Sequence, residues 1–182
     1  MNEEKIPKPK KSLYSIYIKR LIDLVISGIG ILVLSPVFLV IVFLEWKYHG
    51  KPAIYKLKRP GKDNKIFTVY KFRSMTNDSD ENGVLFPEED RLTPFGIFLR
   101  KTSLDELPQL INIFKGDMAI IGPRPLLVEY LDYYSPRHAM RQSVRPGLVC
   151  ITDNDQNGPV TWRTQFESDI EYIENYKFAN RY

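Results

Sequence analysis

The chain has 182 residues and a mass of 21.3 kDa, enough for one domain or for one domain with a membrane anchor. With 43% hydrophobic and 26% charged residues, its composition excludes a wholly disordered protein. The single cysteine excludes an intrachain disulfide and a cysteine-built zinc site, and two histidines exclude a multi-histidine metal centre. Dinucleotide-binding GxGxxG, P-loop and hydrolase-elbow motifs are absent.

The net charge of +4 is unevenly distributed. Residues 1–73 contain 15 Lys and Arg against 5 Asp and Glu, whereas residues 74–182 contain 11 against 17. A basic N-terminal half beside a long apolar run favours attraction to an anionic membrane surface. No basic helix with interleaved aromatic residues and no RNA-binding signature occurs, so we expect no nucleic-acid partner.

Residues 21–44 form an apolar run of 24 residues that contains one charge, Asp23. Such a run exceeds the roughly 18 apolar residues that mark a membrane-segment candidate. Ser35 and Pro36 lie in its middle. Proline removes a backbone donor and clashes with the carbonyl four residues earlier, so we expect the helix to bend or break there. The Ser35 hydroxyl is expected to help satisfy the freed carbonyls.

Basic residues flank the apolar run on both sides, six before it and seven after it. Because basic flanks remain in the cytoplasm, this symmetry favours a re-entrant helix that enters and leaves the same membrane leaflet. The alternative is a plain spanning helix with a mild proline kink.

The rest of the chain is predicted to be a small, mainly helical α+β domain with a short β-hairpin. Segments 52–59 and 66–75 are rich in β-forming residues, and a Pro-Gly turn separates them. A loop with six acids is expected at 76–90. Helices are expected at 94–101, 103–115, 126–134 and 162–176, and a short strand at 118–121.

The segment Ser103-Leu104-Asp105-Glu106 contains the densest group of reactive side chains. Ser103 and Glu106 have the spacing of a capping box, which would explain the acids without catalysis. The alternative is that Asp105 is a catalytic nucleophile. A carboxylate has a reference pKa of about 3.9, so it is ionised near neutral pH and needs no general base. Glu106, together with Asp105, would then hold Mg²⁺ to neutralise a phosphate.

Chemistry on a phosphate requires nearby cations. Arg124 lies between two prolines, which limits its backbone freedom and suits a bidentate phosphate clamp. The alternative is an ordinary turn with an exposed arginine. Lys71 and Arg73 are two residues apart on a predicted strand and would share one face, either substrate-binding or solvated. Two further candidate substrate-binding residues each precede a Pro-Gly pair: Arg59 and Arg145.

In this order the motifs resemble those of the bacterial sugar transferase family, the monotopic polyprenyl-phosphate phosphoglycosyl transferases. The resemblance covers about residues 17–147 and, more weakly, 162–176. The motifs that carry it are Lys19-Arg20, Ile22-Asp23, Ser35-Pro36, Arg59-Pro60-Gly61, YKFRSM at 70–75, SLDELPQL at 103–110, KGDM at 115–118, GPRP at 122–125 and VRPG at 144–147.

The resemblance implies a two-step reaction. The aspartate matching Asp105 attacks the β-phosphate of a UDP-sugar and releases UMP. The covalent sugar phosphate then passes to undecaprenyl phosphate in the membrane, as the first membrane step in the assembly of an exopolysaccharide, lipopolysaccharide or capsule. Glu106 matches a Mg²⁺-associated glutamate, and Asp169 matches an acid of the family's C-terminal helix that we assign to substrate binding. Downstream glycosyltransferases are candidate partners.

The resemblance also implies a location. Ser35-Pro36 matches the kink of a re-entrant anchor, which would place both termini and the active site on the cytoplasmic face of the inner membrane. Residues 1–14 would then be a flexible basic tail, residues 15–50 a membrane helix–break–helix and residues 51–182 the cytoplasmic catalytic domain.

One segment departs from the family's pattern. In the loop after Arg145-Pro146-Gly147, Asn157 replaces the arginine expected to contact the nucleotide sugar. Asp153 and Asp155 add negative charge that would repel a diphosphate. This departure keeps open a catalytically impaired or non-enzymatic relative that binds nucleotide sugars or acts as a scaffold.

A third hypothesis is a lipid-surface protein whose acids only cap helices. It predicts that the carboxylates at 105 and 106 lie more than about 10 Å from Lys71 and Arg124, because groups acting on one phosphate must converge.

Overall fold

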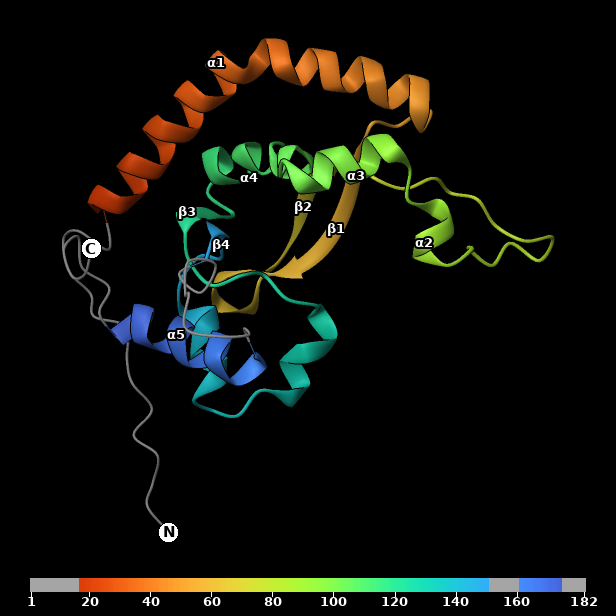
Figure 1. Cartoon of the computed structure of the whole chain (residues 1–182). Helices are drawn as coiled ribbons and strands as arrows, with labels where there is room; N and C mark the ends of the chain where they lie inside the picture. The colour runs from red at the N-terminus through yellow and green to blue at the C-terminus, as the bar shows by residue number, and fades with distance from the viewer. Residues whose placement is uncertain (1–16, 151–160, 175–182) are drawn as a thin grey trace.

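The computed structural model describes residues 17–150 and 161–174. The predicted N-terminal tail at 1–14, the divergent loop positions 153–157 and the end of the last predicted helix at 175–176 lie outside these residues. Figure 1 shows one long N-terminal helix, α1 (Lys19–Tyr48), arching over a small domain of short helices and strands. The α+β class and the hairpin are as predicted from the sequence.

Helix α1 is continuous across Pro36, and Figure 1 shows that it bends along its length. Of the bend or break expected from the sequence, the structure has the bend. Pro36 has no N–H for the carbonyl of Leu32, four residues earlier. The Ser35 hydroxyl donates to that carbonyl at 2.8 Å, as predicted. This bond replaces the lost backbone bond, so the helix bends without unwinding.

Both ends of α1 are fastened to the same domain. At the N-terminal end, Arg20 donates to the carbonyls of Ile113 and Phe114 at 2.6 and 2.8 Å. Asp23, the charge inside the apolar run, is buried, pairs with Lys19 and accepts from the Ile120 amide at 3.1 Å. The middle of the helix is exposed, and many apolar residues of α1 are more than half exposed, among them Leu32, Val33, Leu39, Val40 and Phe43. Among the described residues, α1 is the one helix long and apolar enough to cross a membrane.

The predicted hairpin is formed by β1 (Ile54–Pro60) and β2 (Ile66–Phe72), which pair antiparallel with Ile54 opposite Phe72. Asn112 of helix α4 (Gln109–Lys115) fastens the second strand to that helix. Its side-chain oxygen accepts from the Tyr70 amide at 3.1 Å, and its nitrogen donates to the Thr68 carbonyl at 2.7 Å. Lys71 is thereby held beside the chain segment that leads into α4.

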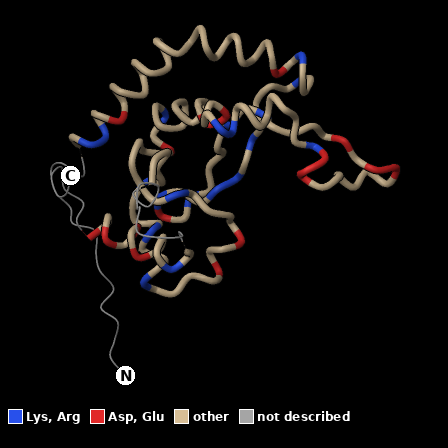
Figure 2. Tube along the Cα trace, in the orientation of Figure 1, with Lys and Arg blue, Asp and Glu red and all other residues tan. Residues whose placement is uncertain are grey.

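After the hairpin, an acidic loop containing the short helix α2 (Glu88–Arg91) projects from the domain (Figure 2). Helix α3 (Pro94–Lys101) begins as predicted, because the Thr93 hydroxyl accepts from the Gly96 amide at 2.9 Å. In Figure 1, α3 and α4 lie beneath the arch of α1.

The helix predicted at 103–115 does not form as one element. Ser103 has a φ of 55° and makes no capping hydrogen bond, so the capping-box interpretation is wrong. A 3₁₀ turn, η3 (Leu104–Glu106), comes first, and α4 begins at Gln109 after Pro108. A left-handed residue at 103 and a proline without a backbone donor together prevent a continuous helix.

The remaining elements form a second lobe. Strand β3 (Ala119–Ile121) pairs parallel with β4 (Gly147–Val149), and the predicted helix at 126–134 is a 3₁₀ segment, η4 (Val128–Tyr133). The 3₁₀ segment η5 (His138–Ser143) packs on α5 (Trp162–Glu174) through four buried residues: Met140, Val144, Ile170 and Ile173.

Candidate active site

Four elements bring charged side chains together at one cavity. Asp105 does not line this cavity and lies behind the lining residue Lys71, 3.7 Å from its Nζ. β2 provides Lys71, η3 provides Asp105 and Glu106, the turn after β3 provides Arg124, and β1 provides Arg59. Two leucines that flank the acids in sequence, Leu104 and Leu107, pack against the core of Ile41, Phe72 and Leu99. Because both leucines are held by the core, the position of the two acidic residues between them in the chain is fixed.

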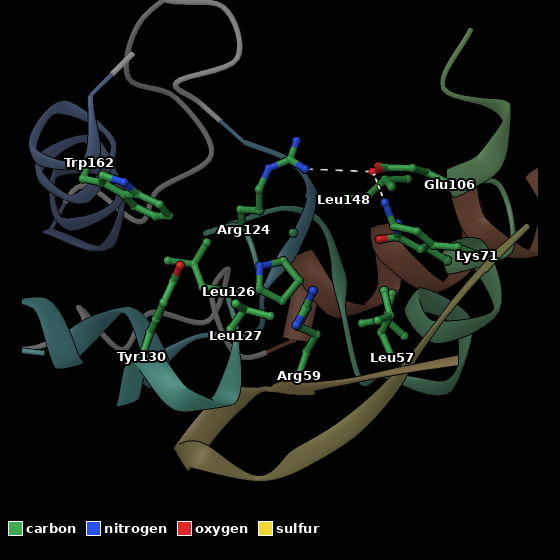
Figure 3. Close-up of a pocket in the computed structure, with 14 residues that line it drawn as sticks. Leu57, Arg59, Lys71, Glu106, Arg124, Leu126, Leu127, Tyr130, Leu148 and Trp162 are labelled. Atoms are coloured by element: carbon green, nitrogen blue, oxygen red, sulfur yellow. Dashed lines mark hydrogen bonds and ion pairs between the residues drawn. The ribbon is translucent and has the colours of Figure 1, made fainter. Parts of the chain in front are cut away.

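The carboxylates and cations converge. Lys71 Nζ lies 2.6 Å from Glu106 Oε1 and 3.7 Å from Asp105 Oδ2. Arg124 Nη1 lies 3.9 Å from the same Glu106 oxygen. Figure 3 shows Lys71 and Arg124 pointing toward the Glu106 carboxylate from two different elements. These distances contradict the hypothesis that the acids only cap a helix far from the cations.

Asp105 is mostly buried, with a side chain 12% exposed. Burial raises the pKa of its carboxyl above the ordinary value, the Lys71 charge opposes that rise, and the neighbouring Glu106 charge adds to it. The nearby cation therefore keeps a desolvated carboxylate ionisable. A partly desolvated anion beside a cation is the environment in which a carboxylate nucleophile acts.

A cavity of about 360 Å³ opens beside these groups (Figure 3). Arg59, Lys71 and Arg124 supply its positive charge, and Glu106 and Gln109 are its other charged or amide side chains. Apolar side chains form much of the remaining lining: Leu57, Val69, Leu126, Leu127 and Leu148. Such a mixture of an apolar wall and a few convergent polar groups is typical of a small-molecule site.

A second cavity, of about 320 Å³, is lined by aromatic side chains: Tyr130, Tyr133, Tyr134, Trp162 and Phe166. Tyr130 and Trp162 also line the first cavity, so the two are adjacent. In Figure 3 these two rings lie on the side of Arg124 away from Lys71. A ligand with a charged part and a flat ring could therefore extend from one cavity into the other.

The oxygen atoms of the two adjacent carboxylates are suitable ligands for a magnesium ion. Mg²⁺ is usually held by one or two carboxylates together with water and substrate phosphates. Asp105 and Glu106 could supply two oxygen ligands. Within residues 17–150 and 161–174, no cluster of three or more His, Cys, Asp or Glu side chains forms an all-protein metal site.

Arg73 and Arg145 lie away from the cavity. Arg73 follows the end of β2, so its side chain does not continue the alternation that places Lys71, and it donates to the Pro52 carbonyl at 3.3 Å. Burial and, second, the Arg73 charge lower the pKa of His49 at the end of α1. Arg145 donates to the Gly116 carbonyl at 2.9 Å, beside the N-terminal end of α1.

Asp169 is also outside both cavities. Its side chain is 5% exposed and accepts from Arg141 Nε at 2.6 Å. The sequence reasoning did not find Arg141, Tyr130 or Trp162. The aromatic residues gave no spacing signal, and the partner of Asp169 lies 28 residues away in the chain, beyond any helical or strand period.

Comparison with known proteins supports the family resemblance that the ordered motifs indicated. The family model described as "Bacterial sugar transferase" matches residues 14–181. The chain is 40% identical over 161 residues to an uncharacterized sugar transferase, EpsL, of Bacillus subtilis, covering 88% of this chain and 80% of that protein. It is 33% identical to the undecaprenyl-phosphate galactose phosphotransferase of Salmonella typhimurium, covering 90% of this chain and 38% of the relative.

A third relative is the UDP-glucose:undecaprenyl-phosphate glucose-1-phosphate transferase of Klebsiella pneumoniae. The identity is 36% over 160 residues, covering 85% of this chain and 34% of that protein. The chain thus spans little more than a third of the length of these last two relatives, whose names state a substrate. Because the family model matches nearly the whole chain, the chain belongs to the bacterial sugar transferase family.

Proposed function

We propose that the protein is a phosphoglycosyl transferase that moves a sugar 1-phosphate from a UDP-sugar to undecaprenyl phosphate. The observation that carries this proposal is the contact of Asp105 with Lys71, which lines one cavity together with Glu106 and Arg124. The names of two relatives state undecaprenyl-phosphate sugar-phosphate transfer, which supports the same reaction class.

The reaction proceeds by two displacements at one phosphorus. A carboxylate oxygen of Asp105 bonds to the β-phosphorus of the UDP-sugar, and the bond from that phosphorus to the bridging oxygen breaks, so UMP leaves. A phosphate oxygen of undecaprenyl phosphate then bonds to the same phosphorus. The aspartyl oxygen–phosphorus bond breaks, and the Asp105 carboxylate is restored.

The cations of the cavity hold the donor. Lys71, Arg124 and Arg59 place three positive charges where a diphosphate would lie against the carboxylates. A ring of the donor would then reach the aromatic cavity through Tyr130 and Trp162. Mg²⁺ held by Glu106 and Asp105 would supply charge neutralisation that lets an anionic nucleophile approach a phosphate.

A re-entrant anchor is supported by the packing of α1. Arg20 and Asp23 fasten its first arm, and Ile41 packs its second arm into the core of the same domain. A helix that crosses the bilayer would separate its ends by the membrane, whereas both ends here contact one small domain. Apolar side chains exposed on α3 and α4 give that side of the domain further affinity for lipid: Ile97, Phe98, Ile111 and Phe114.

The test is release of UMP by the full chain in lipid nanodiscs, screened across UDP-sugars with undecaprenyl phosphate and Mg²⁺. We expect turnover with at least one sugar and its loss in Asp105→Asn. The matched control is Asp132→Asn, the same chemical change at an exposed position of η4, which should keep full turnover. Undiminished UMP release by Asp105→Asn would refute the assignment of the nucleophile.

The same screen distinguishes the alternative of a non-enzymatic relative. A protein that binds UDP but forms no phosphosugar adduct with any UDP-sugar would be a nucleotide-sugar-binding or scaffolding member of the family. Adduct formation is detected by intact-mass measurement, which needs no acceptor lipid.

A further inference from the structure

Arg141, on η5, is a buried cation that the reaction above does not use. Its side chain is 1% exposed. A buried guanidinium must have its N–H groups satisfied, because an unpaired buried charge is strongly destabilising. The bonds that satisfy it therefore identify the parts of the fold that depend on this residue.

The guanidinium of Arg141 joins three segments. Its Nε donates to Asp169 of α5 at 2.6 Å, its Nη1 to the Tyr134 hydroxyl at 3.0 Å, and its Nη2 to the Arg124 carbonyl at 3.0 Å. It also lies over the Phe166 ring at 4.8 Å from the centroid. Asp169 thus holds the Nε side of the planar guanidinium. The Nη2 side bonds the turn at 122–125, from which Arg124 extends to the cavity.

That turn needs external support. Pro123 and Pro125 have no backbone N–H, so the turn contains fewer donors of its own. Its first half is fastened to β4, where the Gly147 amide donates to the Pro123 carbonyl at 2.9 Å. A Cβ at Gly147 would lie 2.1 Å from the Gly122 nitrogen, so the two chain segments are in closest contact there. The hydrogen bond from Arg141 holds the next carbonyl in the chain, that of Arg124.

We infer that Arg141 is a positioning residue for Arg124, and that Asp169 acts by orienting Arg141. Arg124 extends from this turn with 44% of its side chain exposed and reaches to 3.9 Å from Glu106. A shift of its backbone would move the guanidinium away from the phosphate position. The part of the inference that concerns donor binding rests on the proposed function, and the part that concerns the turn does not.

The informative variant is Arg141→Lys. It keeps a positive charge near Asp169, but an ammonium group has no planar fork and cannot reproduce the three directed bonds. Arg137→Lys is the matched control. Arg137 also links this segment to α5, with Nη2 2.9 Å from Glu167 and Nη1 3.8 Å from Glu174, and neither of these pairs involves the turn at 122–125.

The first measurement is hydrogen–deuterium exchange of the full chain in nanodiscs. We expect the amides of residues 119–127 to exchange about tenfold faster in Arg141→Lys than in the wild type, as for loss of one hydrogen bond to a charged group. They should be unchanged in Arg137→Lys. Equal exchange at 119–127 in Arg141→Lys and the wild type overturns the inference. If Arg141→Lys does not fold, Asp169→Asn, which leaves Arg141 without its ionic partner, takes its place.

The second measurement is the dissociation constant of UDP, determined in the wild-type and Arg124→Ala backgrounds. Arg141→Lys should weaken UDP binding about tenfold in the wild type and less than about twofold when Arg124 is absent, because positioning and positioned residues are not additive. An equal loss in both backgrounds means that Arg141 supports the fold in general, and the inference fails. A wild type that binds no UDP would instead refute the proposed function, while the exchange result still decides whether Arg141 holds the turn.

Discussion

The pH dependence of the reaction gives the sharpest test of the site. In the proposed mechanism Asp105 must be ionised to attack. Because burial raises the pKa of its carboxyl, activity should fall on acidification at a higher pH than for an exposed aspartate. Lys71 opposes that rise from 3.7 Å. At this distance the attraction between unit charges is about 1 kcal/mol in bulk water and about 4 kcal/mol at an effective dielectric constant of 20.

Lys71→Gln removes this attraction. We therefore expect the acidic limb of the pH–rate profile of UMP release to move to higher pH. In the metal-free protein, Glu106→Gln removes a like charge and should lower the pKa of the Asp105 carboxyl, the opposite direction. Lys58→Gln is the control, since Lys58 lies on the exposed side of β1 and bonds Thr68. A uniform fall in rate in Lys71→Gln, with the limb unmoved, would refute the electrostatic link between Lys71 and Asp105.

Three further outcomes are expected. Asp105→Asn should raise the melting temperature at pH 7, and each gain of about 1 kcal/mol in the free energy of unfolding corresponds to about 2–4 °C. A carboxyl whose pKa is raised on folding costs stability once it ionises, so this gain should vanish as the pH falls below about 4. A melting temperature lowered at pH 7 would contradict that sign. Trp162→Ala should raise the KM for the UDP-sugar about tenfold with kcat little changed, as for loss of one stacking contact of about 1–3 kcal/mol, whereas an unchanged KM would exclude the aromatic cavity from donor binding. Epitope tags placed at both termini should resist protease added to intact spheroplasts and be cut after lysis, and cleavage of one tag in intact cells would indicate a spanning helix.

Local rules predicted those parts of the fold whose determinants are adjacent in sequence. Thr93 followed by proline began a helix where expected, and Ser35 satisfied the carbonyl that Pro36 leaves free. Both depend on residues within one turn, where backbone geometry alone decides the contact.

The errors arose where geometry or distance overrode a local pattern. Ser103 has the capping-box spacing, but its left-handed φ turns its side chain away from that role. Arg73 would share the face of Lys71 only if the strand continued, and β2 ends at Phe72. Asp169 was assigned to substrate binding from the family resemblance alone, and that role stays a prediction. Its partner Arg141 lies 28 positions away, so no sequence pattern indicated their contact.

The residue types indicated that acids and cations would form one site, but the sequence did not show how tertiary packing brings them together. Lys71 and Glu106 are 35 residues apart, and they meet because Asn112 ties α4 to β2 and the leucines of η3 enter the core. Tertiary packing of this kind has no signature in sequence spacing.

The hydrogen bonds of Arg20 and Asp23 to the domain determine whether the domain can be produced without α1. Excising α1 would leave the carbonyls of Ile113 and Phe114 and the amide of Ile120 without these partners. It would also remove Ile41 from the core that it shares with Leu99. Helix α1 is therefore a structural component of the domain, and a fragment beginning after it should unfold or aggregate.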